Sequence, residues 1–374
     1  MKFRIQKAEL QDVLQTLIGV VPSRATFPVL HNFSFRLEGN ILEVGATDLD
    51  QGIRKTGEEE GERDGGIIVN ARRLVDLIKS LVDPSITTVS FDAQDYVVNV
   101  RWSERGYSTL TGFDITEFPP FPEVVEVSEV QMSASELAFL VEKTAFAVTT
   151  DPTRVIMSGV YMEAADNKVS MVGTDSHRLG LASIDMENVT LEQGVIIPPK
   201  VLRNFLHSVP ADAVVEIRIS QKYVLFSYDN IQMFSKLVDG KYVAYKNVIP
   251  QNFTHEIQVR TTELINKIRC VISMASLRTR KIRMQIQDSS LELTATDSES
   301  GGFSCEEMAI IHEGEGSFCI GFNGNFLVEI LGMCKTEEVK IKMTSAKGAC
   351  VVEPVGEDLN FSFLLMPLRD FADE

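Results

Sequence analysis

Residues 168–179, KVSMVGTDSHRL, contain an alternating apolar pattern that stops at a Thr-Asp pair. Val169, Met171 and Gly173 alternate with other side chains, which is the period of a β-strand. The same kind of segment ends in Thr47-Asp48 and again in Thr296-Asp297. The three pairs are 127 and 122 positions apart, and this spacing indicates one structural unit that is repeated three times.

Two amphipathic helices are predicted in each copy of the unit, because apolar residues recur there at i, i+3, i+4 and i+7. The first helices begin their apolar stripes at Leu10, Leu137 and Leu264, again 127 positions apart, and the second helices begin theirs at Leu74, Leu202 and Leu327. Ser133 and Glu136 have the spacing of a capping box before the second copy. We therefore predict an α+β fold of three repeated domains, each with two helices packed on antiparallel sheet.

Proline-rich segments mark the predicted joints between the repeated units. They lie at residues 118–122, FPPFP, and at residues 249–252, IPQN. A repeat of about 125 residues has the size of a whole domain rather than of a solenoid turn. The expected domains are residues 1–125, 126–252 and 253–374.

Composition favours a cytoplasmic protein without a cofactor. The chain has 374 residues, 44% of them hydrophobic, and no apolar run long enough to cross a membrane. Its five cysteines include no C-x-x-C pair, so we expect reduced thiols and no metal site. The formal net charge of -17 predicts repulsion from nucleic acid unless basic residues are concentrated on one surface.

A hydrolase site is the first alternative raised by residues 174–178, TDSHR, because Asp175, Ser176 and His177 are all present. If the strand continued through them, Asp175 and His177 would share a face that Ser176 leaves, whereas a triad needs the nucleophile bonded to the base. A structural turn, with Asp175 accepting from backbone amides, is the preferred interpretation. We therefore expect no catalytic residues.

Basic residues recur at the start of the predicted second helices. Arg72 and Arg73 stand there in the first unit, and Lys200 and Arg203 stand at the matching place in the second. Any one pair is most simply a solubilising surface charge, but repetition favours a surface that faces an anion. The sequence does not say which way the basic run at residues 278–283 faces.

With these features, the chain resembles the β subunits of bacterial DNA polymerase III, the sliding clamps. The resemblance extends over nearly the whole chain, from Met1 to Arg369. It rests on the repeated units together with Thr26-x-Pro28-x-Leu30, residues 174–179, residues 234–240, Ile320-Gly-Phe-Asn323 and Met366-Pro-Leu-Arg369. It implies a non-catalytic DNA replication processivity factor, in which a head-to-tail homodimer closes a ring of six domains around double-stranded DNA without reading its sequence.

The resemblance also implies partners and site residues. The partners would be the replicative DNA polymerase catalytic subunit, the clamp loader and other repair and replication proteins that carry a clamp-binding peptide. DNA would be faced by Arg24, Arg72, Arg73 and Lys200, and the dimer interface would contain Tyr107, Val271 and Ile272. The pocket for partner peptides would be formed by Arg154, Met157, Thr174, His177, Arg178, Leu179, Val248, Asn323, Phe326, Leu364, Leu365, Met366, Pro367 and Leu368.

Some positions depart from the family pattern. Val243 stands where a proline is usual, Asn247 where a basic residue is usual, and Asp151 where the family can place a neutral polar residue near DNA. The chain also runs on through residues 370–374, DFADE, from which Phe371 could cover the pocket.

Two other functions remain open from the sequence. A clamp-like scaffold without a role in replication would not be retained on circular DNA after loading. A small-molecule enzyme built on repeated domains would need a buried pocket with coupled titrating groups and would show turnover.

Overall fold

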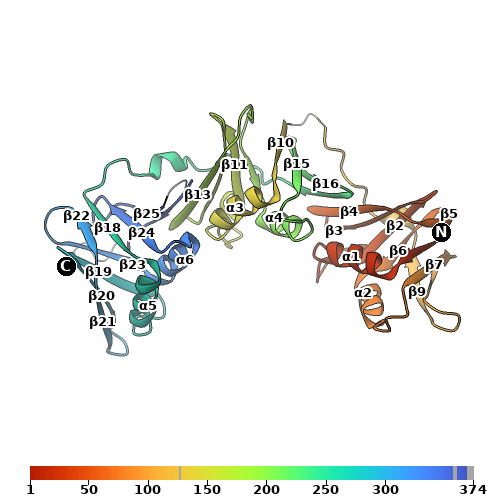
Figure 1. Ribbon diagram of the computed structural model, residues 1–374, viewed down its shortest axis with the longest axis horizontal. Helices are drawn as coiled ribbons and strands as arrows, with labels where there is room; N and C mark the ends of the chain where they lie inside the picture. The colour runs from red at the N-terminus through yellow and green to blue at the C-terminus, as the bar shows by residue number, and fades with distance from the viewer. Residues whose placement is uncertain (126–127, 357–359, 369–374) are drawn as a thin grey trace. The chain divides into compact units, whose positions relative to one another are not determined.

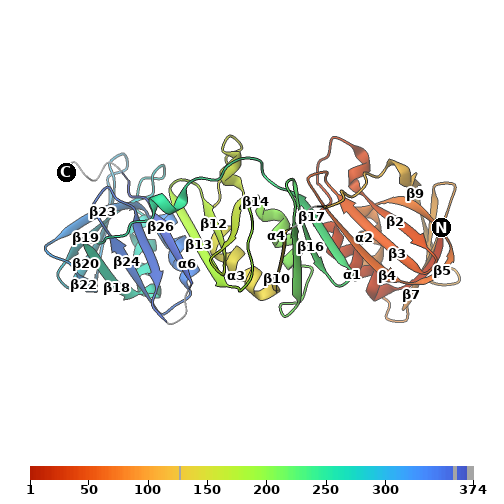
Figure 2. The same cartoon turned by 90° about the horizontal axis from the view of Figure 1, so that it is seen from above.

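The computed structural model describes residues 1–125, 128–356 and 360–368. The chain divides into two compact units, one made of residues 1–137 and 197–237 and the other of residues 138–196 and 238–374. Each unit therefore contains some of the residues of the middle predicted domain, residues 126–252. Figures 1 and 2 show the elements of both units.

One antiparallel sheet extends through the first unit. In spatial order its strands are β10 (Ser128–Ser133), β15 (Val214–Ile219), β16 (Tyr223–Tyr228), β17 (Ile231–Lys236), β4 (Gln51–Glu58), β3 (Ile41–Thr47), β2 (Asn32–Glu38), β6 (Gly65–Asn70), β9 (Tyr107–Phe113), β8 (Val97–Arg101), β7 (Thr88–Gln94), β1 (Lys2–Gln6) and β5 (Glu60–Arg63). The pairing of β17 with β4 joins the last strand of the middle repeat to the first repeat. The main-chain hydrogen bonds of the sheet thus continue across this predicted joint.

Three helices pack against this sheet, and two short 3-10 helices lie in the segments between its elements. The helices are α1 (Lys7–Ile18), α2 (Ala71–Ser80) and α4 (Pro199–Leu206), and the 3-10 segments are η1 (Pro28–His31) and η2 (Ile115–Glu117). Residues Leu10, Val13, Leu14 and Leu17 of α1 are buried, as their spacing predicts. The helix α4 ends before Val209, the last predicted apolar position, because Pro210 disfavours helical backbone at the residue before it.

The second unit contains two antiparallel sheets. The larger has the order β14 (Val195–Ile197), β11 (Val160–Ala165), β12 (Lys168–Thr174), β13 (Arg178–Asp185), β26 (Phe361–Leu365), β25 (Cys350–Pro354), β24 (Glu338–Met343), β18 (His255–Arg260) and β22 (Ile311–Glu313). The smaller is β21 (Gly302–Ala309), β20 (Ser290–Asp297), β19 (Lys281–Gln287) and β23 (Phe318–Asn323). Here β13 pairs with β26, which again joins the last strand of one repeat to the preceding repeat.

The remaining helices are α3 (Ala134–Thr144), α5 (Thr261–Ile272) and α6 (Gly324–Cys334), with 3-10 segments η3 (Val155–Ser158) and η4 (Tyr245–Val248). The predicted capping box at the start of α3 is confirmed. The amide of Ser133 donates to Glu136 Oε2 over 2.7 Å, and the amide of Glu136 donates to Ser133 Oγ over 3.1 Å. With six α-helices and the sheets among the described residues, the predicted α+β class is confirmed.

The Thr-Asp pairs form turns, as the preferred interpretation held. Asp175 Oδ1 accepts from the amides of His177 and Arg178 at 2.9 and 3.0 Å. Asp48 Oδ1 accepts in the same way from the amides of Asp50 and Gln51 at 3.1 and 2.9 Å. The alternative in which the strand continues through residue 177 is wrong, because β12 ends at Thr174 and Ser176 has a positive φ of 76°.

One pH-dependent contribution to stability is expected in the first unit. Glu59 is buried between β4 and β5, and burial and the nearby Glu9 raise its pKa from 4.5 to about 7. The folded chain then binds a proton that the unfolded chain releases between these values, so stability falls as the pH rises from 4.5 to 7. At the upper end of this pH range the loss in the free energy of unfolding is at most about 3 kcal/mol.

Replacing Glu59 by glutamine should therefore raise the melting temperature at pH 7.5 and flatten its dependence on pH between 4.5 and 7. Glu58→Gln, at the exposed neighbouring position, is the matched control and should leave the slope unchanged. Thermal unfolding followed by circular dichroism at several pH values tests both. An unchanged slope in Glu59→Gln would mean that this carboxyl is not the titrating group.

Candidate functional site

Four of the predicted pocket residues, Arg178, Leu179, Leu364 and Leu365, meet where β13 pairs with β26. Leu179 lies opposite Leu364 across these strands, and Arg178 lies opposite Leu365. Leu179 and Leu364 belong to a cluster of buried side chains that also contains Val172, Ile196, Tyr242, Tyr245, Ala349 and Val351. Segments far apart in the sequence therefore share one apolar surface at this joint.

The segment after β26 is fixed to this surface by main-chain bonds. The amide of Met366 donates to the carbonyl oxygen of His177 over 2.8 Å, and the amide of Leu368 donates to the carbonyl oxygen of Gly321 over 2.9 Å. Met366 remains 40% exposed, and Val248 in η4 is 53% exposed. Such exposed apolar side chains beside a buried cluster can be covered by a ligand.

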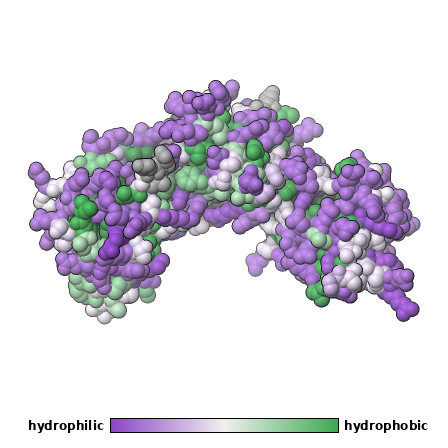
Figure 3. Space-filling view, viewed as in Figure 1, coloured by the Kyte–Doolittle hydropathy of each residue, from purple (hydrophilic) through white to green (hydrophobic). Residues whose placement is uncertain are grey.

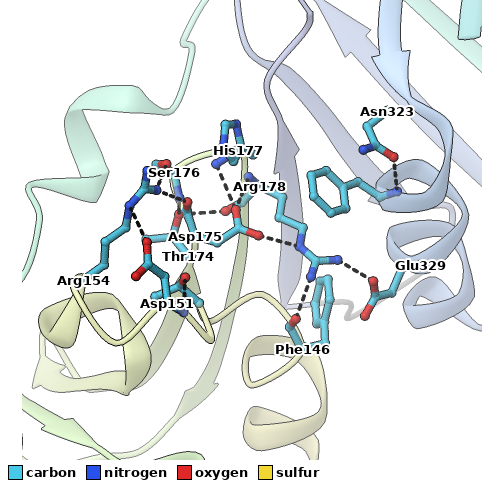
Figure 4. A network of polar contacts seen from close by, with 12 residues as sticks. Phe146, Asp151, Arg154, Thr174, Asp175, Ser176, His177, Arg178, Asn323 and Glu329 are labelled. Carbon is cyan, nitrogen blue, oxygen red and sulfur yellow. Dashed lines mark hydrogen bonds and ion pairs between the residues drawn. The ribbon is translucent and has the colours of Figure 1, made fainter. Parts of the chain in front are cut away.

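Arg178 connects the turn after β12 to α6, as Figure 4 shows. Its Nε donates to Asp175 Oδ2 over 3.0 Å, its Nη1 to Glu329 Oε2 over 2.5 Å, and its Nη2 to the carbonyl oxygen of Phe146 over 3.1 Å. Its guanidinium also lies 4.5 Å from the centre of the Phe326 ring. The Arg178 side chain is only 10% exposed, so these contacts hold α6 and the turn in a fixed geometry.

Phe146 and Glu329 were missed by the sequence reasoning. Phe146 contributes its carbonyl oxygen and its ring, which lies 5.4 Å from the Arg178 guanidinium. Glu329 stands three positions after Phe326 on α6, and this i, i+3 spacing is the signal that could have indicated a shared face.

The other predicted polar residues have structural contacts. Arg154 Nη1 donates to Ser176 Oγ over 2.9 Å and to the carbonyl oxygen of Asp175 over 3.2 Å. Thr174 Oγ1 donates to the carbonyl oxygen of Arg178 over 2.7 Å. Asn323 Oδ1 accepts from the amide of Asn325 over 3.0 Å and so caps α6.

Not every predicted pocket residue presents a side chain at the surface. Leu365 is fully buried, so its side chain belongs to the core, and its place in the pocket stays a prediction. Met157, Pro367 and Leu368 are half-buried. The His177 ring is exposed and stacks beside Phe326, with ring centres 6.4 Å apart.

A hydrolytic triad is not formed at residues 175–177. Asp175 Oδ1 accepts from two main-chain amides rather than from an imidazole, and its other oxygen accepts from Arg178. Ser176 Oγ accepts from Arg154. These polar atoms are therefore used to shape the turn.

The rim of this surface contains the two departures from the family pattern. Val243 is half-buried and packs against the apolar cluster, and Asn247 in η4 is exposed. Asp151 accepts from the amide of Thr153 over 2.9 Å and forms an ion pair with Arg154. The proposed cover by Phe371 lies outside the described residues.

The basic residues predicted to face DNA are all exposed in the first unit. Arg72 and Arg73 lie in the first turn of α2, Lys200 lies in the first turn of α4, and Arg24 lies in the loop after α1. Lys200 Nζ is 3.2 Å from Asp48 Oδ2, which leaves its side chain 56% exposed. These cations are therefore available to an anion in solvent.

The residues predicted for a dimer interface differ in exposure. Tyr107 on β9 is 55% exposed, with the Arg101 guanidinium 5.0 Å from its ring centre. Val271 is fully buried in α5, where its side chain packs in the core of its own domain, and its place at a dimer interface stays a prediction. Ile272 is 9% exposed, and the exposed apolar residues that follow α5 are Met274 and Leu277.

The basic run at residues 278–283 can now be placed. Lys281 and Arg283 alternate on β19 with Ile282 and Met284, which are fully buried. Arg283 therefore points outward, where its Nε donates to Cys319 Sγ over 2.8 Å. Figure 3 shows that hydrophilic residues cover most of the drawn face, with smaller apolar patches among them.

Among the described ranges, no group of three or more His, Cys, Asp or Glu side chains is arranged to hold a metal ion. In these same ranges no helix is long and apolar enough to span a bilayer. Burial raises the pKa of the Cys334 thiol to about 12, so this thiol is protonated at neutral pH.

Comparisons with known proteins agree along the whole length of the chain. Sequence-family models of the DNA polymerase III beta subunit match residues 1–122 (N-terminal domain), 131–243 (central domain) and 246–369 (C-terminal domain). The beta sliding clamp of Pseudomonas putida is 30% identical over 99% of this chain and 100% of its own length. That of Vibrio cholerae is 27% identical over the same shares.

Solved structures agree with these sequence matches. The DNA polymerase III subunit beta from Pseudomonas aeruginosa matches with a TM-score of 0.93 and 27% identity, over 99% of this chain and 100% of that one. The DNA polymerase sliding clamp from Bacillus subtilis matches with a TM-score of 0.90 and 27% identity, over 99% of each chain.

Proposed function

The chain belongs to the family of DNA polymerase III beta subunits, the sliding clamps, and from this premise we propose that it closes a ring around duplex DNA as a head-to-tail homodimer. Like the family, it is a non-catalytic processivity factor in DNA replication. The observation that carries this conclusion is the match of all three repeated domains over 99% of the chain. We place the domains at residues 1–125, 126–252 and 253–374, and the protein in the cytoplasm.

A sliding ring needs phosphate contacts but no contacts that read bases, because base contacts would hold it at particular sequences. The exposed cations Arg24, Arg72, Arg73 and Lys200 supply this chemistry in our proposal. All four lie in the first unit of a chain whose net charge is -17, so this proposal requires most of the acidic residues to lie on other surfaces.

The apolar surface at the β13–β26 joint is the proposed pocket for partner peptides. A short peptide gains most of its affinity from one or two buried anchors, and here the anchor would lie against Leu179, Val248, Met366 and Leu368. The Arg178 contacts fix Phe326 and the turn in advance, which lowers the entropic cost of binding. The proposed partners are the replicative polymerase, the clamp loader and other proteins that carry such a peptide.

Changing Arg24, Arg72, Arg73 and Lys200 together to alanine is expected to weaken DNA binding and to flatten its salt dependence. Each lost phosphate contact lowers the slope of log K against log salt by about 0.9. The control changes Arg36, Lys168, Lys222 and Lys241, which are exposed on strands or the loops between them. Filter binding at several salt concentrations would contradict the assignment if both quadruple variants gave the same slope.

Primer extension on a long single-stranded circle tests the proposed function. With the cognate polymerase and clamp loader, the chain should lengthen the products of a single binding event. A clamp-like scaffold without a role in replication would leave the product length unchanged.

A further inference from the structure

The two joints between repeats are built from corresponding strands. In the first unit, β4 follows the Thr47-Asp48 turn and pairs with β17. In the second unit, β13 follows the Thr174-Asp175 turn and pairs with β26. Both turns use the aspartate Oδ1 to accept from the amides two and three residues later. The joints can therefore be compared position by position.

This comparison pairs the apolar positions of the second joint with very different residues in the first. Thr47 lies opposite Gly52 as Thr174 lies opposite Leu179, and Gly45 lies opposite Arg54 as Val172 lies opposite Leu181. Across the joint itself, Gly52 lies opposite Phe234 as Leu179 lies opposite Leu364. The positions corresponding to Val172, Leu179, Leu181 and Leu364 are thus Gly45, Gly52, Arg54 and Phe234.

The two glycines leave a hollow that Phe121 occupies. A Cβ placed on Gly45 would lie 3.0 Å from carbons of the Phe121 ring, and one on Gly52 would lie 2.9 Å from that ring and 2.2 Å from the ring of Phe234. The Phe121 ring meets Phe234 edge to face, with centres 5.4 Å apart, and the Arg54 guanidinium lies 5.6 Å from its centre. The aromatic ring therefore lies where side chains at the glycines would otherwise be.

The segment that brings Phe121 belongs to the linker between the first two repeats. Its sequence at residues 118–125, FPPFPEVV, is stiffened by three prolines, so little entropy is lost when it lies along the sheet. Residues 121–125 form one wall of a groove on this surface, and Arg54, Arg218 and Leu225 are among the residues that line the rest of it. The Phe121 ring is therefore the part of the linker that fills the hollow, whereas Glu123 is exposed.

We propose that the first joint is a binding groove for an aromatic side chain, and that the chain's own linker is its resident ligand. This inference rests on the proposed peptide pocket at the second joint, whose counterpart the groove is. A tethered segment acts at an effective concentration in the millimolar range, so free peptides of ordinary affinity do not displace it. Each chain accordingly offers partner proteins one open site rather than two.

The test adds the resident segment back as a separate molecule. Phe121→Ala empties the aromatic position, and the probe is a fluorescein-labelled peptide FPPFPEVV, a copy of residues 118–125. A second change, Met366→Asp, blocks the second joint in both chains that are compared. Fluorescence anisotropy should show at least tenfold tighter binding to the Phe121→Ala chain than to the chain with Phe121 intact, with one peptide per chain.

The control peptide FPPAPEVV should not bind, because it lacks the ring. Equal binding of both peptides, or no gain in the Phe121→Ala chain, would overturn the proposal. If that variant does not fold, Phe121→Leu keeps an apolar side chain and should give a smaller gain. If neither variant folds, Phe121 is a core residue rather than a ligand, which also overturns it.

Failure at the first joint can be separated from failure at the second. At the second joint, a polymerase-derived peptide should bind with the same affinity in chains with and without Phe121→Ala when Met366 is intact. If the polymerase-derived peptide bound neither of these chains, the proposed pocket at the second joint would be contradicted. The measurement with FPPFPEVV would still test the first joint separately.

Discussion

Replacing Met366 by aspartate is expected to lower the affinity for a polymerase-derived peptide by roughly 30-fold or more, as loss of a central anchor contact costs about 2 kcal/mol. The side chain is 40% exposed beside the buried cluster that contains Leu179 and Leu364. A charge there must lose water when an apolar anchor binds, and no partner for it lies in the apolar wall. Fluorescence anisotropy with a labelled peptide measures the effect.

The matched control is Ile311→Asp, since Ile311 is an exposed apolar residue on the edge strand β22 of the same unit. It should leave peptide affinity unchanged, and both variants should retain the mass of the parent assembly. Full affinity in Met366→Asp would show that partner peptides bind elsewhere.

Charge at the proposed dimer interface is expected to convert the ring into monomers. Ile272 is 9% exposed at the end of α5, and an unpaired aspartate buried there costs several kcal/mol when the interface forms. Because this change also touches the chain's own core, Leu277→Asp provides a second variant at a position that is 77% exposed. Sedimentation should show half the parent mass for both.

Val214→Asp is the control for this experiment, because Val214 is an apolar residue on β15 that is 65% exposed. It should remain a dimer. If Leu277→Asp and Ile272→Asp also remain wholly dimeric, the interface lies on another surface.

The periodic features of the fold could be predicted from the sequence. The six α-helices of the described residues follow from apolar spacing, and the Thr-Asp turns follow from the short side chain of aspartate, which accepts from nearby amides. These are local effects, decided by a few neighbouring residues. The pairing of β4 with β17 and of β13 with β26 depends on strands that are far apart in the sequence, and nothing local specifies such a register.

The residues of the candidate site were also hard to predict where their contacts are not local in the sequence. The family resemblance assigned Leu179 and Leu364 to the same pocket, and in the structure they lie opposite one another on paired strands. Val271 and Leu365 were placed at surfaces but are fully buried, because an apolar residue looks the same in sequence whether it faces its own core or a partner. Glu329 was missed because its partner, Arg178, lies 151 positions away.

Retention on closed and open DNA tests the central claim most directly. After the cognate clamp loader places the labelled chain on a nicked circular plasmid, gel filtration should recover it with the DNA at high salt. Cutting the circle once should release it, because a topological link ends when the ring can slide off an end. Equal retention on circular and linear DNA, or equal loss from both, would contradict a ring that encircles the duplex.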